Sequence, residues 1–494
     1  MKKKLIAFAI MIALLVGSMS LALTACDPDS GRRQLPGWEE GKTNIVYYTW
    51  GSDEENELFQ EVIDAYKAEH DDINIILQKA GNDYYGDLDL QLTGRTPPDI
   101  VQMKPGYIAS YLESGAIASL QKYINKSKVI TDDMIWEYND GYRYNPKTNE
   151  IGNHSDEIYS LIKDFSCDFV MNYNKKLVND SVKDLGYPQD SNGYPSMETP
   201  MTWSQYMSFA GAMQSGNTMG ASLDNEPFQQ LLEWIQQSGG SLWSADHKTV
   251  VDIKNDANVR AAFDYYRMLR DRAGNSPTFR PNDTNMSATA FAKALTATST
   301  VQVGPAQLKE RQAATIFVGR WAYTTYSMDS NANKCDTGFA PPPVPNGLEI
   351  TDSTKYAGIT AMVGMSIASK SKYKDEAWNF MEYYFTEGQK ILAKKGYNIP
   401  GNRQVAANEF LNDASLSAKE KEVNQFFYDL ALNHGFVITF NRYISQYSVE
   451  QTLSAELSAY FANSGGKNFS QSDWEKCLDS IRTKLQAKLD RAIR

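Results

Sequence analysis

The sequence predicts an α/β fold with parallel-type sheets, in a chain long enough for two domains. Segments with the residue pattern of strands alternate with helical patterns through the first two-thirds, and helical patterns dominate the last third. Such alternation is typical of sheets that are covered by helices. The chain has 494 residues and no internal repeat, whereas a single domain usually has about 100 to 200 residues.

The first segments define the expected topology. Residues 44–50 are rich in β-branched and aromatic residues and end at Gly51. Residues 54–70 carry apolar residues at helical spacing, and residues 73–78 predict a second strand. This order predicts a strand–helix–strand unit, which is the building block of a parallel sheet.

Later segments continue the pattern. Residues 99–103 predict a strand after the Pro97-Pro98 break, and residues 126–155 are polar and rich in Asn and Tyr, with a turn at 144–149. The other expected elements, in chain order, are a helix at 109–116, extended segments at 158–164 and 168–173, a helix from 174, helices at 202–213, 228–237 and 256–273, a strand at 314–318, an extended connector at 340–345, and helices at 374–385, 387–395, 416–463 and 473–492.

The N-terminus has the anatomy of a secretory leader. Three lysines at positions 2–4 precede an uninterrupted apolar stretch at 5–16, and small residues follow. That stretch is shorter than the about 20 residues that a membrane-spanning helix needs. Leu23-Thr-Ala-Cys26 matches the bacterial lipobox, in which the cysteine becomes the lipidated first residue of the mature chain. The alternative is an ordinary leader or an anchor helix in which Cys26 is incidental.

The lipobox interpretation predicts where the mature protein is held. Residues 1–25 would be removed, and Cys26 would be anchored at the extracellular face of the cytoplasmic membrane. Residues 26–43 begin with a segment rich in Pro, Gly and charge that lacks apolar periodicity, so we expect a flexible tether between membrane and domain.

Composition argues against several classes of function. The formal charge is −11, and it becomes −14 when the three lysines of the leader are removed, so we expect no nucleic-acid partner. Cys167, Cys335 and Cys477 are far apart and odd in number, which favours buried free thiols over a disulfide framework. The four histidines form no HxxxH pair, so we predict no zinc or iron site built on imidazole, and no cofactor.

Six separate motifs occur in order along the mature chain. They are Ile45–Glu54, Thr96–Val101, Ile158–Phe165 with Met171–Leu177 and the Thr202-Trp203 pair, Leu308–Trp321, Ser366–Phe380, and Asn398–Asn402. Each alone is weak. Together they resemble the extracellular solute-binding proteins that feed ABC importers, in particular the carbohydrate-binding group.

This resemblance implies a fold and a set of partners. It implies a type II periplasmic-binding-protein-like fold, whose two hinged α/β lobes close on a ligand in a central cleft. One lobe would comprise residues 44–157 and about 334–385, and the other residues 158–333 and about 386–494. The implied protein is a monomer that binds a carbohydrate and meets the membrane permease of an ABC importer. It performs no catalysis.

The resemblance also maps candidate ligand residues onto this chain. They are Trp50, Ser52, Asp53 and Glu54 after the first strand, Tyr84 and Tyr85 in a loop that often faces the cleft in this family, Met103 and Lys104, Asp164 and Asp168 beside the crossover, Trp243, Trp321 and Arg403. Polar groups would satisfy sugar hydroxyls while aromatic rings stack on the C–H face. Trp50 and Trp321 are the strongest candidates because they match loops after strand ends, where open α/β sheets bind ligands.

The sequence departs from the family pattern in places that affect the ligand more than the fold. Ile162 stands where a proline is usual, and Arg311-Gln312 stands where a Gly-Lys pair is usual. Residues 124–157, residues 276–306 and the long C-terminal helices exceed a minimal member.

Other functions stay open at this point. A glycosidase would need two carboxylates about 5–10 Å apart, and Asp53, Glu54, Asp164 and Asp168 are candidates for such a pair, although no hydrolase motif is present. An adhesion or sensor-partner protein would use the same fold without transport. A polyamine, a phosphorylated polyol or ferric iron are the alternative ligands, with Tyr84-Tyr85 as thin support for iron.

Overall fold

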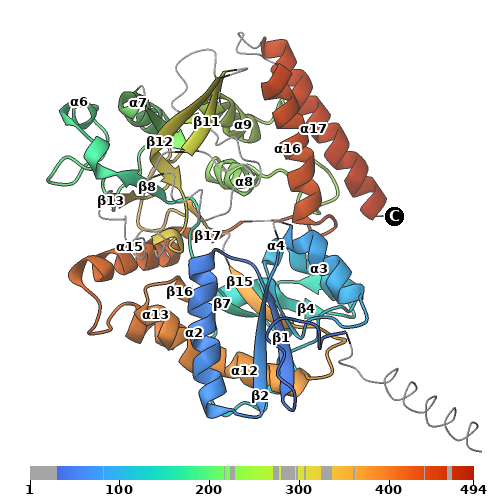
Figure 1. Cartoon of the computed structure of the whole chain (residues 1–494). Coiled ribbons are helices and arrows are strands. Elements are labelled where there is room, and N and C mark those ends of the chain that lie inside the picture. The colour runs from blue at the N-terminus through green and yellow to red at the C-terminus, as the bar shows by residue number, and fades with distance from the viewer. Residues whose placement is uncertain are drawn as a thin grey trace, which may run out of the picture.

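The computed structural model shows two α/β lobes stacked end to end (Figure 1). It describes residues 31–493 apart from 82, 216, 223–227, 271–277, 280–294, 296–298, 305–306, 324–335, 360–361, 439 and 464–469. Within these residues, no helix is both long enough and apolar enough to span a bilayer.

The first lobe is built on a six-stranded mixed sheet. Its strand order is β16 (Ile399–Pro400), β7 (Leu161–Phe165), β15 (Val363–Ile367), β3 (Ile100–Met103), β1 (Thr43–Thr49) and β2 (Ile73–Lys79). The strands β1, β2 and β3 are mutually parallel, with Thr43 opposite Ile73 and Tyr47 opposite Ile100. The strand–helix–strand unit expected at 44–78 is therefore present.

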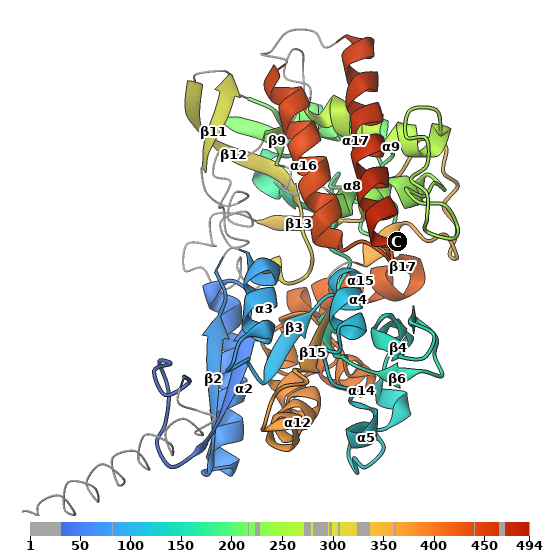
Figure 2. The ribbon, with the colours of Figure 1, turned by 90° about the vertical axis from the view of Figure 1, so that its right-hand side faces the viewer.

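Helices cover both faces of this sheet, as Figure 2 shows. They are α2 (Asp53–Glu69), α3 (Tyr84–Thr93), α4 (Pro105–Glu113), α5 (Gln121–Ile124), α12 (Lys374–Tyr383), α13 (Gln389–Lys394), α14 (Arg403–Val405) and α15 (Ala418–His434). π-Helical turns at Tyr384–Gly388 and Ala406–Phe410 continue α12 and α14. A three-stranded sheet of β5 (Glu150–Ile151), β4 (Arg143–Asn145) and β6 (Glu157–Ile158) and the 3-10 turns η1 (Asp132–Met134) and η2 (Glu137–Tyr142) complete the lobe.

The helix α2 illustrates why these residues fold as they do. Ser52 caps its N-terminus by accepting from the Glu55 backbone N–H at 3.1 Å, while the Glu55 carboxylate accepts from the Ser52 N–H at 2.7 Å. This reciprocal capping box satisfies two N–H groups that the helix start leaves open. Gly51 has φ = 126°, a conformation that L side chains rarely adopt, and so permits the turn from β1 into the helix.

The second lobe has its own sheet. The order is β10 (Thr278–Phe279), β9 (Thr218–Ser222), β12 (Gln307–Phe317), β8 (Met171–Asn174) and β13 (Thr337–Ala340), and β11 (Ser299–Gly304) pairs with β12. Its helices are α6 (Asp180–Lys183), α7 (Trp203–Met213), α8 (Phe228–Gln237), α9 (Ala257–Arg270), α16 (Gln446–Asn463) and α17 (Gln471–Ala492), with a 3-10 turn η3 at Lys175–Leu177. The side chains of α8, α9, α16 and α17 share one apolar core with β8.

The pairing moves the division between the lobes away from the one expected from sequence. The strands β7 and β16, assigned above to the second lobe, pair in the first sheet, and β13, assigned to the first lobe, pairs in the second. The helix α15 also packs in a first-lobe core. The chain therefore enters the second lobe after Phe165, because β7 is buried beside β15, and finally returns to it after the β14–β17 pair (Ala357–Ile359 and Gly435–Val437).

Three local expectations need correction. Tyr84 and Tyr85 begin the helix α3 instead of lying in a loop. The single helix expected at 416–463 is interrupted, because Gly435–Val437 form β17 against β14. The described part of the expected tether, residues 31–43, is bound to the first lobe, since Arg32 is only 5% exposed and pairs with Asp99 at 2.8 Å. Cys26 lies outside the described residues.

Candidate functional site

The first sheet directs its carboxyl edge toward the second lobe. The strands β1 and β3 both end there, at Thr49 and Met103, and α4 starts directly after β3. In open α/β sheets, ligands bind outside this edge. The contact between α4 and α16 of the second lobe also lies here, so both lobes contribute to the same region (Figure 2).

Four aromatic side chains line the first-lobe side of this region, and we call them the aromatic wall. The Trp50 ring meets that of Tyr84 edge to face at a centroid distance of 4.6 Å, and Tyr84 meets Tyr85 in the same way at 5.1 Å. The Tyr85 ring lies flat on that of Tyr107, with centroids 3.6 Å apart. Trp50 and Tyr85 are half-buried, whereas Tyr84 and Tyr107 are buried.

Hydrogen bonds hold the aromatic wall in place. The Tyr84 hydroxyl donates to the Gln102 carbonyl and accepts from the Gln102 N–H, both at 2.9 Å. The Tyr85 hydroxyl accepts from the Lys104 N–H at 2.9 Å. Burial raises the pKa of Tyr84 and of Tyr85 well above the ordinary value, so both remain neutral phenols.

The second lobe faces the aromatic wall with carboxylate and amide groups from α16 and α8. Glu450 Oε2 accepts from the Tyr107 hydroxyl at 2.7 Å, and Oε1 accepts from Gln446 Nε2 at 2.6 Å. Gln229 Nε2 approaches the same carboxylate at 3.4 Å. Burial raises the pKa of Glu450, although the hydrogen bonds from Tyr107, Gln446 and Gln229 oppose that shift. We call Tyr107, Gln229, Gln446 and Glu450 the interlobe polar cluster.

The lobes approach each other closely at this point. A β-carbon added at Gly106, in the first turn of α4, would overlap the Gln446 side-chain oxygen and come within 2.9 Å of Phe440. The Tyr447 hydroxyl reaches Asp83 in the first lobe at 3.3 Å. The structure is therefore closed over the interlobe polar cluster.

A second group of candidates lies where the chain crosses between the lobes. A β-carbon added at Gly319 would come within 2.5 Å of both Asp168 Oδ1 and Ser166 Oγ, and within 3.0 Å of the Trp321 ring. Trp321 follows a second-lobe strand but packs against a core of the first lobe. Two crossing segments therefore meet at Gly319.

Buried charged groups hold these crossing segments. Arg320 is fully buried and donates to Asn424 on α15 at 2.6 and 3.0 Å, and burial lowers the pKa of its guanidinium to about 9. Glu233 on α8 is also fully buried, and its carboxylate accepts from the Gly358 N–H at 3.1 Å. Burial raises the pKa of Glu233 well above the ordinary value. The first contact joins Arg320, in a crossing segment, to α15 of the first lobe. The second joins Glu233, on α8 of the second lobe, to the backbone of β14.

Asp164 belongs to a buried network inside the first lobe. It forms an ion pair with Lys163 and accepts from Asn398 Nδ2 at 3.0 Å. Nearby, Glu55 accepts from the Tyr397 hydroxyl at 2.7 Å, and burial raises the pKa of Glu55. Because these carboxylates are satisfied within the lobe, we assign them to holding β7 in the sheet.

The structure brings together some of the residues expected from sequence. Trp50, Tyr84, Tyr85 and Lys104 meet at the aromatic wall, and Asp168 and Trp321 meet at the crossing near Gly319. Glu54 is half-buried in the first turn of α2, beside this edge of the sheet.

Other expected residues are helix-capping, core or exposed positions. Ser52 is the cap of α2, while Met103 and Trp243 are 0% and 3% exposed in the cores of their lobes. The Asp53 side chain is 89% exposed and pairs with Lys79 at 2.6 Å. Arg403 is exposed, with its guanidinium 5.2 Å from the centroid of the Trp136 ring. We leave these residues and Asp164 out of the proposed site.

Residues that come together from far apart along the chain are not predicted from the sequence. Tyr107 and Glu450 are 343 positions apart, so no local pattern relates them. The spacing of four between Gln446 and Glu450 places both on one helix face. Because a single helix is expected over 416–463, this spacing alone does not single out Gln446 and Glu450 as a site.

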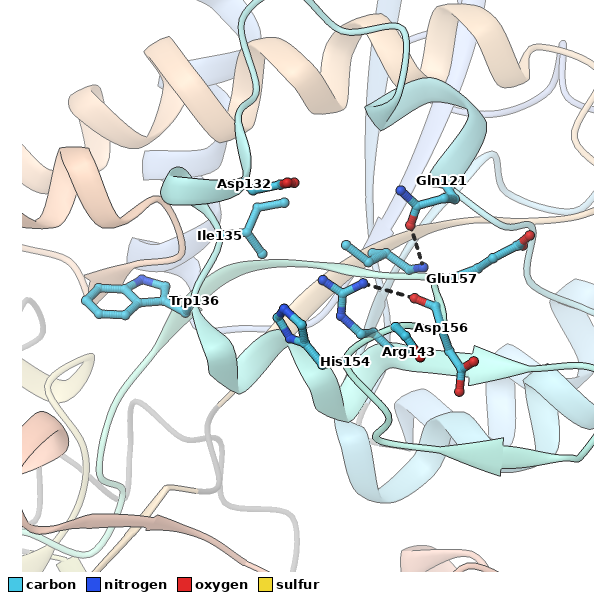
Figure 3. Close-up of a pocket in the computed structure, with 10 residues that line it drawn as sticks. Gln121, Asp132, Ile135, Trp136, Arg143, His154, Asp156 and Glu157 are labelled. Carbon is cyan, nitrogen blue, oxygen red and sulfur yellow. Dashed lines mark hydrogen bonds between the residues drawn. The ribbon is translucent and has the colours of Figure 1, made fainter.

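A separate cavity of about 270 Å³ lies on the first lobe, beside the β4–β6 sheet (Figure 3). Arg143 crosses its floor, with Nε donating to Asp140 at 2.9 Å and a terminal nitrogen donating to the Asp156 carbonyl at 2.9 Å. His154 lies beside Arg143 in the same view, opposite Ile135. This cavity does not include the aromatic wall. Among the described residues, no group of His, Cys, Asp and Glu has an arrangement that would hold a metal ion.

Comparison with known proteins places the chain in a broad group. The family model for bacterial extracellular solute-binding proteins matches residues 50–391. No curated protein sequence matches at a significant level.

Several solved structures are similar over their full length. An ABC substrate-binding protein from Listeria monocytogenes in complex with cycloalternan is 17% identical, with a TM-score of 0.66 and coverage of 90% of this chain and 99% of that one. The maltose/maltodextrin-binding domain MalE from Bdellovibrio bacteriovorus, bound to maltotriose, is 14% identical, with a TM-score of 0.63 and coverage of 92% of this chain and 100% of that one. UgpB from Mycobacterium tuberculosis, in complex with glycerophosphocholine, is 16% identical, with a TM-score of 0.66 and coverage of 92% of this chain and 100% of that one. At these identities the likeness establishes the two-lobed fold.

Proposed function

Because the chain belongs to the bacterial extracellular solute-binding proteins, we propose that it captures a sugar or oligosaccharide outside the cell and delivers it to the permease of an ABC importer. The observation that carries this proposal is the aromatic wall of the first lobe facing Gln229, Gln446 and Glu450 of the second lobe. The protein would release the sugar unchanged.

The two sides of the site suit the two kinds of surface on a sugar. Stacking rings such as Trp50 and Tyr85 match the C–H face of a pyranose, whereas carboxylate and amide groups such as those of Glu450 and Gln446 match its hydroxyls. In the closed structure Tyr107 and Gln446 Nε2 donate to the Glu450 carboxylate, whereas the Gln446 side-chain oxygen is buried without a hydrogen-bond partner among the described residues. Hinge opening would separate Tyr107 from Glu450 and present both to a ligand, and closure over the sugar would then exclude water.

Delivery requires that the protein stay near its permease. The lipobox at Cys26 supports anchoring at the extracellular face of the membrane, as the sequence predicts. We further propose a monomer, since each chain carries both halves of the site.

Binding without chemistry is the better proposal for the carboxylates present. Hydrolysis of a glycosidic bond would use two carboxylic groups placed on either side of that bond. Among those considered from sequence, Asp53 is largely exposed and paired with Lys79, and Asp164 is buried in an ion pair with Lys163.

The features that favour a sugar also suit a polyamine, because ammonium groups bind to aromatic faces and carboxylates.

Calorimetric titration of the purified mature chain tests this proposal. The titrants would be maltooligosaccharides and a panel of other glycans, with spermidine and glycerophosphocholine as competing solute classes. We expect saturable binding of at least one glycan, recovered intact by mass spectrometry. An Arg403→Ala variant is the control, since Arg403 is exposed and away from the aromatic wall. Glycan fragments after incubation, or binding of only the non-carbohydrate titrants, would refute sugar capture.

A further inference from the structure

The first turn of α4 meets a buried glutamine of the second lobe. Gln446 begins α16 and is only 2% exposed. A β-carbon added at Gly106 of α4 would overlap the Gln446 side-chain oxygen, so it is the glycine that allows the α4 backbone to come this close. The contact between α4 and the lower end of α16 is visible in Figure 2.

The hydrogen bond to Glu450 decides which end of the Gln446 amide faces α4. Gln446 Nε2 donates to Glu450 Oε1 at 2.6 Å. An ionised carboxylate only accepts, so the amide nitrogen must lie on that side and the amide oxygen on the other. This oxygen is buried, and no group in the described part of the chain donates to it. A buried acceptor without a donor is costly, so this oxygen is suited to accept from a ligand.

The α4 side of the contact offers a donor. The first N–H groups of a helix have no partner within the helix, and Lys104, the cap residue, makes no side-chain hydrogen bond to this turn. Pro105 carries no N–H, and the Tyr107 N–H bonds to the Lys104 carbonyl at 3.1 Å. The Gly106 N–H is therefore left for a ligand, at the positive end of the helix dipole.

We propose that Gln446 Oε1 and the first turn of α4 together bind one hydroxyl group of the captured solute, and that the solute is an uncharged sugar or polyol. This inference rests on the proposed function, because the two groups belong to different lobes and meet beside the aromatic wall. A hydroxyl fits both groups, since it can donate to the Gln446 oxygen and accept from α4 at the same time.

Two charged classes of solute, which the sequence leaves open, fit this subsite poorly. An ammonium group of a polyamine only donates, and the positive end of α4 disfavours it. An ionised phosphate of a phosphorylated polyol only accepts, and it would meet the acceptor oxygens of Gln446 and Glu450. Gln446 is therefore a residue that determines specificity.

Calorimetric titration with maltotriose and the other glycans of the panel tests the subsite, with spermidine and glycerol 3-phosphate as charged probes. Gln446→Met keeps the length of the side chain but removes the acceptor, and should weaken glycan binding about 3- to 10-fold. The matched control is Gln425→Met. Gln425 donates to Asp429, four residues further along α15, at 2.9 Å, but it is exposed, so Q425M should bind as the wild type does.

An exchange variant separates the acceptor from the bond that holds it. In Q446E/E450Q the amide and the carboxylate trade places, so their mutual hydrogen bond, the total charge and an oxygen facing α4 are all retained. We expect this variant to keep the wild-type affinity. Equal losses in Q446M and Q446E/E450Q would overturn the role of the acceptor, and wild-type affinity in Q446M would overturn the subsite.

Deoxy analogues of the bound glycan give a measurement that does not depend on how well a variant folds. Removal of the hydroxyl that is bound here should weaken binding to the wild type but not weaken binding to Q446M further. If every deoxy analogue loses the same factor in both proteins, Gln446 binds no hydroxyl. Binding of only spermidine or glycerol 3-phosphate to the wild type would overturn the solute class. Failure of sugar capture itself is distinguishable, because no glycan would then bind the wild type.

Discussion

The hydrogen bond between Tyr107 and Glu450 predicts how this protein closes. It joins α4 of the first lobe to α16 of the second at 2.7 Å, and Glu450 is only 5% exposed. Tyr107→Phe removes the donor but leaves the ring, which stacks on Tyr85 with an interplanar angle of 1°. Because the bond spans the lobes, its loss should weaken closure and leave the fold of each lobe intact.

The size of the effect follows from the chemistry of the bond. A hydrogen bond to a charged group contributes about 1.5 to 3 kcal/mol net. In the Y107F closed state, Glu450 Oε2 loses its Tyr107 donor while Oε1 keeps Gln446. In the open state water would replace the lost partner. We therefore expect the ratio of closed to open ligand-free protein to fall about 10- to 150-fold.

The assay is a distance measurement between spin labels, one on each lobe, by pulsed electron resonance. The matched control is Tyr111→Phe, because Tyr111 lies on the same helix and its hydroxyl donates to Asp89 at the same 2.7 Å, but within the first lobe. Y107F should shift the ligand-free distances toward the open form, and Y111F should leave them as in the wild type. If the two variants give the same distances, the reasoning that assigns closure to this bond is wrong.

Three further predictions follow from burial and charge. Trp50→Ala or Trp321→Ala should abolish sugar binding in calorimetry while the melting temperature is retained; unchanged affinity in both would refute the site. Burial raises the pKa of Glu450 in the closed form, so closure should strengthen as the pH falls through that raised value and weaken as the pH rises through it. Glu450→Gln should remove this pH dependence from the spin-label distances. Trp243→Ala should destabilise the protein by about 3–5 kcal/mol in denaturant unfolding and leave sugar affinity unchanged below the transition, because Trp243 is core.

The elements predicted well are those whose signals are local. The β1–α2–β2 unit follows from apolar spacing over fewer than 40 residues. Hydrogen bonds within the helix and burial of its apolar face both depend on neighbours in sequence, so the residues themselves predict the outcome.

The elements predicted poorly depend on remote partners. The helical pattern at 416–463 continues through Gly435, but pairing of β17 with β14 interrupts it there. Likewise the composition of residues 26–43 is typical of a free tether, but Arg32 pairs with the carboxylate of Asp99, 67 residues away. In both places a tertiary contact overrides a correct local reading of propensity.

The candidate site shows the same limit in its aromatic residues. Trp50 and Trp243 are the same residue type and each lies near glycines in the sequence, but only Trp50 directly follows a strand at the edge facing the other lobe. There it remains half-buried beside Tyr84, whereas Trp243 is enclosed by its own lobe. Residue type therefore predicts that rings are available to stack on a sugar. The position of a ring relative to strand ends decides which of them faces the second lobe, and only the fold brings Glu450 opposite.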